Sequence, residues 1–218
     1  MEGVRIIAHD VNRFTRRVKM QIIGLTGGIS SGKSQVTQFF EKQNVPVLDA
    51  DAIVKQLQQP GSPLLQDIAH ALGENLVQEG VLNRQALGEL IFTNEKAKET
   101  LNALIHPRIR QIFEEEIEGY RQQKTPLLVL DIPLLFESHF EDLADFIVVV
   151  SVSYDTQLER LMKRDGISKD YAHSKIMSQM PLTLKCERAD YVIHNNHQLE
   201  DLQKELNYFY KKVLKCGK

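Results

Sequence analysis

The chain has 218 residues, 42% of them hydrophobic, which is enough for one compact domain with a real core and smaller insertions. Its formal net charge of -2 provides no general attraction to nucleic acid or to an anionic membrane, so neither is expected as a partner. The two cysteines, Cys186 and Cys216, fit neither a disulfide framework nor a zinc site. We therefore expect reduced thiols in a cytoplasmic protein.

Residues 1–19 differ from the rest, because they are rich in arginine and carry only one short apolar piece, Val4–Ala8. That piece is too short for a secretory signal or a membrane span. We expect a disordered extension, followed by one folded domain over residues 20–218. Removing the extension is expected to leave folding and activity nearly intact.

A phosphate-binding pattern follows the first predicted strand, Gln21–Leu25. Residues 27–34 match G-x-x-x-x-G-K-[ST] at every fixed position, and a helix begins near Lys33. In such a loop, backbone N–H groups and the helix dipole hold the β-phosphate, the lysine reaches the β- and γ-oxygens, and the serine ligates Mg²⁺. The alternative is a glycine-rich turn that fits the pattern by chance. We expect ATP and Mg²⁺ to bind, the nucleotide at Gly28, Ile29, Ser30, Ser31, Gly32, Lys33, Ser34 and Gln35. Ser30 is expected at negative φ, because positive φ strains a non-glycine residue.

The apolar runs that follow predict the fold. After a helix carrying Val36, Phe39 and Phe40, further strands are predicted at Val45–Leu48, Leu127–Leu130, Phe146–Val150 and Tyr191–His194. Continuous apolar runs suit strands buried on both faces, and the alternation with helical periodicity predicts an α/β fold, a parallel sheet wrapped by helices. The last helix shows one apolar face, formed by Leu199, Leu202, Leu206, Phe209 and Val213.

Two segments read as insertions into this core. Residues of about 52–106 lack a good strand and predict helices at Leu64–Leu72, Arg84–Phe92 and from about Asn94 to His106, where Pro107 should start a new helix or kink the old one. We expect this segment to bind an acceptor. The second insertion, about 160–185, is polar and reads as a lid.

Other segments of the chain indicate which class of phosphate-loop protein this is. A GTP switch needs N-K-x-D and D-x-x-G segments at strand ends, and neither is suitably placed. A small-molecule kinase needs a carboxylate that faces the acceptor hydroxyl and mobile arginines that neutralise the transferring phosphoryl group.

Candidate carboxylates follow two strands. Alternation along an extended segment would put Asp49 and Asp51 on the same side, where ligands lie in an open α/β sheet. The alternative is that they cap the next helix. We favour a functional role for Asp51 and capping or orientation for Asp49. Asp131 either holds Mg²⁺ through water or belongs to a plain strand-end turn.

Candidate cations come from the lid and the first insertion. Arg160 and Arg164 lie on one helical face and are either phosphate clamps or a solvated basic face. Arg188 is a further cation for the nucleotide. His106 either ends a helix or, with Arg108, contacts a phosphate-bearing acceptor.

From Met20 onward the chain resembles the dephospho-coenzyme A kinase family. The motifs that carry the resemblance are Leu25–Ser34, Asp49–Asp51, Leu104–Pro107, Asp131–Glu137, Gln157–Asp165 and Ala189–Asn195. The resemblance implies a P-loop NTPase core with a helical acceptor-binding insertion and a lid, and transfer of the ATP γ-phosphoryl group to the ribose 3′-hydroxyl of dephospho-CoA. It implies that Lys33, Asp51 (the base), Arg160 and Arg164 are catalytic and that Asp51 also contacts the acceptor. Ser30 and His197 stand where the family usually has glycine.

Two other functions stay open on the sequence alone. One is another small-molecule kinase of this fold, such as a nucleoside monophosphate kinase, and the other is a regulatory ATPase without a small acceptor. A monomer or weak oligomer is expected.

Overall fold

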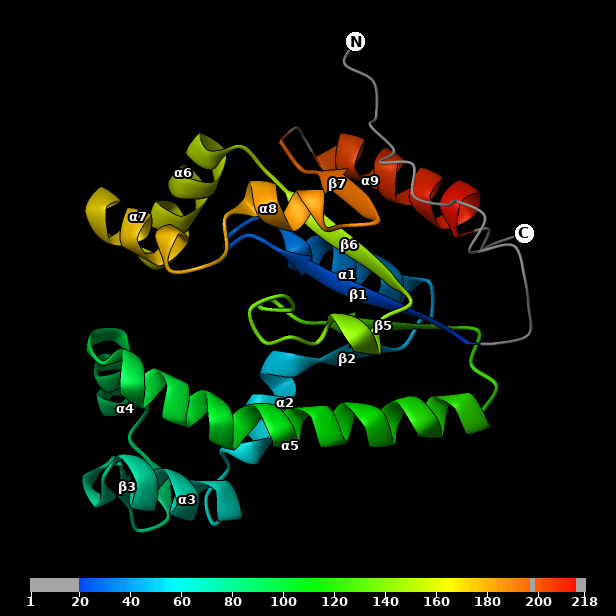
Figure 1. Ribbon diagram of the computed structural model, residues 1–218. Coiled ribbons are helices and arrows are strands. Elements are labelled where there is room, and N and C mark those ends of the chain that lie inside the picture. Colours follow the sequence, from blue (N-terminus) through cyan, green and yellow to red (C-terminus); the bar gives the residue numbers. More distant parts are fainter. Residues whose placement is uncertain (1–19, 197–198, 215–218) are drawn as a thin grey trace. The chain divides into compact units, whose positions relative to one another are not determined.

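The computed structural model describes residues 20–196 and 199–214 (Figure 1). The extension 1–19, His197 and Cys216 lie outside these residues. The described residues form two compact units: one comprises those up to Leu48 and from Tyr120 onward, and the other is Asp49–Gly119.

The first unit is built on one five-stranded sheet in the order β2-β5-β1-β6-β7. The strands are β1 (Gln21–Gly27), β2 (Val47–Asp49), β5 (Leu127–Asp131), β6 (Phe146–Ser151) and β7 (Tyr191–His194). β1 pairs in parallel with both β5 and β6, and β6 pairs in parallel with β7. The predicted parallel sheet is confirmed. β1 is longer than predicted because Thr26 and Gly27 remain paired with β6.

Helices flank this sheet. They are α1 (Lys33–Lys42), α6 (Tyr154–Asp165), α7 (Lys169–Met177), α8 (Leu182–Glu187) and α9 (Leu199–Tyr208), with a 3₁₀ turn η3 (Glu141–Leu143) and a π turn η4 (Phe209–Val213). Phe39 and Phe40 of α1 and Leu202 and Leu206 of α9 join the strands in one buried cluster. The predicted apolar positions Val36, Phe39, Phe40, Leu202, Leu206 and Phe209 therefore lie in the core, whereas the side chains of Leu199 and Val213 are outside those described.

A second, smaller apolar cluster joins α6 to α7. Its buried members are Leu158, Leu161 and Ala172, and Ile29 of the P-loop packs against it. In Figure 1 α6 and α7 lie side by side, drawn in yellow-green and yellow. This pair, which falls largely within the predicted lid, thus has its own small core.

The second unit is mainly helical. Its elements are α2 (Ala50–Leu57), α3 (Pro63–Leu72), η2 (Glu74–Leu76), β3 (Val77–Gln78), β4 (Val81–Leu82), α4 (Arg84–Thr93) and α5 (Glu95–Gln122), which ends beyond it. Ser62 and Asn83 cap α3 and α4 through side-chain oxygens. The antiparallel pair β3–β4 was not predicted, since strands of two residues have no periodicity. No new helix starts at Pro107, because α5 continues through it.

None of the described helices is long and apolar enough to span a membrane.

Candidate active site

The loop between β1 and α1 leaves the start of α1 open. Gly32 is the N-cap residue, with φ 88°, and no side chain caps the helix. A Cβ on Gly32 would lie 2.1 Å from Asn195 Nδ2, so only glycine fits there. The first backbone N–H groups of a helix lack intrahelical partners and attract anions. This arrangement fits a phosphate group.

Ser30 adopts φ 57°, so the expectation of negative φ is wrong. The Ser31 N–H donates to the Gly28 carbonyl at 3.0 Å, which closes a tight turn around this residue. Ser30 Oγ and Ser31 Oγ are buried and have no hydrogen-bond partner among the described residues. Buried hydroxyls without partners are uncommon, and phosphate oxygens would supply acceptors for them.

Lys33 is ion-paired with a buried carboxylate. Its Nζ contacts Asp131 Oδ1, and Thr37 Oγ1 lies 2.6 Å from Asp131 Oδ2. Asp131 is only 4% exposed, so the lysine ammonium compensates its charge. The structure therefore brings together the predicted lysine and the predicted metal carboxylate. Thr37, one helical turn after Lys33, was missed by the sequence analysis.

The donors near Lys33 fit Mg²⁺ chemically. Ser34 is exposed at the start of α1, and Asp131 supplies carboxylate oxygens. Among the described residues no group of three or more His, Cys, Asp or Glu side chains could hold a metal ion by itself. Mg²⁺ commonly uses one or two protein oxygens together with nucleotide phosphates, so the small donor set is sufficient.

Three side-chain amides hold the loop from outside. Asn195 Nδ2 donates to the Ser31 carbonyl at 2.8 Å. Gln157 Nε2 donates to the Ile29 carbonyl at 2.8 Å, and Gln179 Oε1 accepts from the Ile29 N–H at 3.1 Å. None of these three amides was predicted to have a role. The sequence feature that could have indicated a role is the polar residue Gln157 on the otherwise buried face of α6.

The two predicted lid arginines have different surroundings. Arg160 is half-buried on α6, whereas Arg164 is exposed and its Nε donates to Asp165 Oδ1 at 2.7 Å. Lys175 of α7 contacts the other oxygen of Asp165 at 2.9 Å. The hydrogen bond from Arg164, followed by that from Lys175, lowers the pKa of Asp165 to about 2. The same hydrogen bond raises the pKa of Arg164.

Arg188 lies directly after α8 and contacts protein groups. Its Nη2 is 2.5 Å from Glu141 Oε1, and its guanidinium carbon lies 4.5 Å from the centre of the Phe136 ring. Its assignment to the nucleotide stays a prediction.

Lys185 of α8 is fully buried, which the sequence did not indicate. Its Nζ lies 2.8 Å from Glu137 Oε1 and 3.3 Å from the Pro133 carbonyl. Glu137 Oε1 also accepts from the Met180 N–H at 3.0 Å. The pair thus ties the segment before α8 to the chain that follows β5.

Lys185→Met is expected to destabilise the protein by roughly 3–5 kcal/mol, because it leaves the Glu137 carboxylate without its charge partner. The measurement is urea unfolding. The double variant Lys185→Met/Glu137→Gln is the control and should recover most of the loss, since no uncompensated charge remains. Equal stability of the single variant and the wild type would contradict the assignment.

In the second unit, Asp49 caps α2. Its Oδ1 accepts from the N–H groups of Asp51 at 2.8 Å and Ala52 at 3.4 Å. Asp51 is exposed in the first turn of that helix. The alternation argument for these two residues is wrong, because the extended segment ends at Asp49. The capping role that we favoured for Asp49 is confirmed.

The predicted acceptor residues lie on α5. His106 and Arg108 are both half-buried. Arg108 Nη2 lies 2.5 Å from Asp67 Oδ2, and its Nη1 donates to the Leu104 carbonyl. Asp67 was not predicted, since nothing in the sequence relates α3 to α5.

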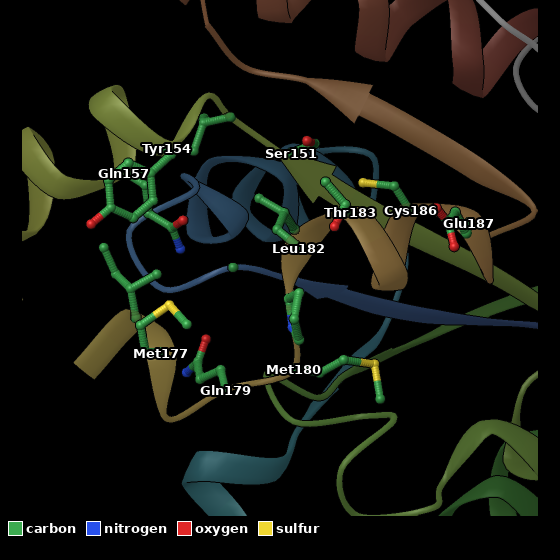
Figure 2. A pocket seen from close by; sticks show the side chains of 14 residues that line it. Ser151, Tyr154, Gln157, Met177, Gln179, Met180, Leu182, Thr183, Cys186 and Glu187 are labelled. Carbon is green, nitrogen blue, oxygen red and sulfur yellow. The ribbon is translucent and has the colours of Figure 1, made fainter. Parts of the chain in front are cut away.

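A pocket of about 490 Å³ lies beside the start of the loop, at Gly28 (Figure 2). Its walls are largely apolar and include Tyr154, Met180 and Leu182. Cys186 also lines it, and burial raises the pKa of this thiol.

The chain is similar to known proteins over most of its length. The family model described as dephospho-CoA kinase matches residues 21–201. The dephospho-CoA kinase of Bacillus cereus (strain ATCC 10987 / NRS 248) is 43% identical over 191 residues, covering 87% of this chain and 96% of that protein. That of Shouchella clausii is 42% identical over 185 residues, with coverage of 84% and 94%.

Solved structures show the same relation. A crystal structure from Thermus thermophilus is 33% identical, with a TM-score of 0.74, and covers 87% of this chain and 95% of its own. Dephospho-CoA kinase from Campylobacter jejuni is 28% identical, with a TM-score of 0.67 and coverage of 89% and 97%. Since the family model spans most of the chain, this protein belongs to the dephospho-CoA kinase family.

Proposed function

We propose that the protein transfers the γ-phosphoryl group of Mg²⁺-bound ATP to the ribose 3′-hydroxyl of dephospho-CoA, giving CoA and ADP in the last step of coenzyme A biosynthesis. The observation that carries the proposal is the P-loop with Lys33 paired to the buried Asp131, in a chain whose residues 21–201 match the family.

The loop and α1 would hold the nucleotide. Backbone N–H groups of residues 32–34, at the start of α1, would hold the β-phosphate, and the Lys33 ammonium would stabilise charge on the β- and γ-oxygens. Ser34, and Asp131 through water, would hold Mg²⁺, which neutralises negative charge on the phosphates. Release of Asp131 from its ion pair would let Lys33 turn to the phosphates.

The acceptor side involves the second unit. Asp51 would orient the ribose hydroxyl and accept its proton as the new oxygen–phosphorus bond forms and the bond to the ADP oxygen breaks. His106 and Arg108 would contact phosphate groups of the acceptor. We assign the acceptor-binding insertion to residues of about 52–106 and the lid to about 160–185.

The direct test is a coupled assay of ADP formation. We expect ADP production that depends on dephospho-CoA and is much weaker with nucleoside monophosphates. Equal ADP production without any acceptor would instead indicate an ATPase, and preference for a monophosphate would indicate a different kinase.

Arg160→Ala and Arg164→Ala are each expected to lower kcat by roughly 10²-fold or more, the loss seen when one preorganised charge donor is removed. The fold should be unchanged, because neither side chain is buried in the core. The measurement is turnover with dephospho-CoA for each variant.

Lys163→Ala is the matched control, since Lys163 is an exposed cation on the same helix and should tolerate the change. Normal turnover in both arginine variants would reduce the pair to a solvated basic face.

A further inference from the structure

The backbone N–H and the backbone carbonyl of Ile29 are both held by side chains from the α6–α8 segment. Gln157 of α6 donates to its carbonyl, and Gln179, between α7 and α8, accepts from its N–H. Figure 2 shows both glutamines beside the P-loop. We propose that Gln157 and Gln179 are positioning residues that hold the P-loop in the shape that binds ATP. The proposal rests on the proposed kinase function.

Helix α6 and Gly28 together determine where the Gln157 side chain lies. It lies in the first turns of α6, whose start is capped by Ser153, and it is only 4% exposed. A Cβ on Gly28 would lie 2.6 Å from Gln157 Nε2. Gly28 therefore lets the amide approach the loop, in addition to its part in the phosphate pattern.

Gln179 is placed by the chain that follows it. The next residue, Met180, donates its N–H to Glu137 Oε1, which is paired with the buried Lys185. The backbone that carries the Gln179 side chain is thus fixed by a buried ion pair. The Gln179 amide therefore contacts the loop from a backbone segment whose position is fixed.

The side chain of Ile29 adds a third link. It packs against the apolar cluster of Leu158 and Leu161 that joins α6 to α7. Ile29 is consequently held at its N–H, its carbonyl and its side chain by residues 157–179. A shift of these residues would move the P-loop through Ile29.

The next residue explains why the loop needs this support. Ser30 has φ 57°, a conformation that costs a non-glycine residue energy. Its Oγ is buried without a hydrogen-bond partner among the described residues, so no such hydrogen bond of its own side chain offsets the energy of this conformation. Gln157 and Gln179 hold the peptide groups on the two sides of the Ile29 Cα, and together with the hydrogen bond from the Ser31 N–H to the Gly28 carbonyl they favour this backbone shape.

Neutral amides suit the place better than charged groups. They fix the N–H and the carbonyl of Ile29 without placing a carboxylate beside the phosphates of ATP. Their loss should therefore weaken nucleotide binding and leave acceptor binding almost unchanged.

The experiment uses the full chain and the variants Gln157→Ala and Gln179→Ala. We expect each to raise the KM for ATP and the Kd of ADP by about three- to tenfold, the range of one neutral hydrogen bond. The KM for dephospho-CoA should change by less than about twofold. Glu159→Ala, at an exposed position on α6, is the matched control and should leave all three values unchanged.

The substitution Ser30→Gly tests whether the two glutamines position the loop or have only a general structural role. Ser30→Gly removes the cost of the left-handed conformation. Because it also removes a hydroxyl that could bind phosphate, the reference is Ser30→Gly alone: in that background Gln157→Ala or Gln179→Ala should lower ADP affinity by much less than in the wild type. Urea unfolding of every variant checks that the fold persists.

Several results would overturn the inference: unchanged ADP affinity in both glutamine variants, equal increases in both KM values, or equal losses of ADP affinity in the Ser30→Gly background and in the wild type. The kinase function is judged separately, by the turnover of the wild type with dephospho-CoA. ADP titration requires no acceptor, so it reports on the loop even if another acceptor proves to be the substrate.

Discussion

Asp51→Asn is expected to lower kcat by roughly 10²- to 10⁴-fold, the usual contribution of a general base. Phosphoryl transfer has a loose transition state, so a carboxylate near the acceptor hydroxyl serves mainly to aim the oxygen and take its proton late. Asparagine keeps the size and polarity of the side chain but cannot accept the proton. ATP binding, which depends on the loop, should stay close to normal. The measurements are turnover with dephospho-CoA and direct ATP titration.

Asp49→Asn is the matched control and should cost much less. Asp49 caps α2 through one oxygen, and asparagine retains an oxygen that can accept the same hydrogen bonds. If the Asp49 variant is crippled and the Asp51 variant is mild, the base has been assigned to the wrong residue, although the kinase function stands. If both turn over normally, the acceptor hydroxyl is not near α2.

Lys33→Ala is expected to lower kcat by roughly two or more powers of ten, because its charge stabilises the β- and γ-oxygens more in the transition state than before it. The structure adds a second effect. The variant leaves the buried Asp131 carboxylate without its cation, which should also lower stability. Turnover and urea unfolding measure the two effects.

Two further variants separate them. Lys33→Ala/Asp131→Asn should regain stability without regaining turnover, since the uncompensated charge is gone but the catalytic cation is still missing. Lys42→Ala removes an exposed lysine from the other end of α1 and should change neither quantity. A Lys33→Ala enzyme with normal turnover would remove the lysine from the mechanism.

The sequence predicted the sheet and the loop because both depend on local patterns. Buried parallel strands appear as continuous apolar runs, and β7 was predicted to its exact ends, Tyr191–His194. The loop is defined by consecutive residues, so Lys33 and Gly32 could be located without any knowledge of the fold.

Contacts between distant residues could not be predicted. The residue before Ser30 is held by Gln157 and Gln179, which lie 128 and 150 residues from Ile29. The buried position of Lys185 depends on its ion pair with Glu137. A lysine in the sequence gives no sign that its side chain will be buried. The error at Asp49 had a local cause: the strand ended earlier than alternation assumed.

The order of the sheet determines when this protein can fold during synthesis. β1 lies at its centre, yet its partners begin at Leu127 and Phe146. The ribosome must therefore release more than a hundred residues before the first strand can pair, whereas Asp49–Gly119 is continuous in the chain and can assemble earlier. Strand pairings so far apart in sequence are slow, because the entropy of loop closure is lost before any contact forms. Until β5 emerges, the apolar residues of β1 have no strand to pair with, and an unpaired apolar strand can associate with other chains.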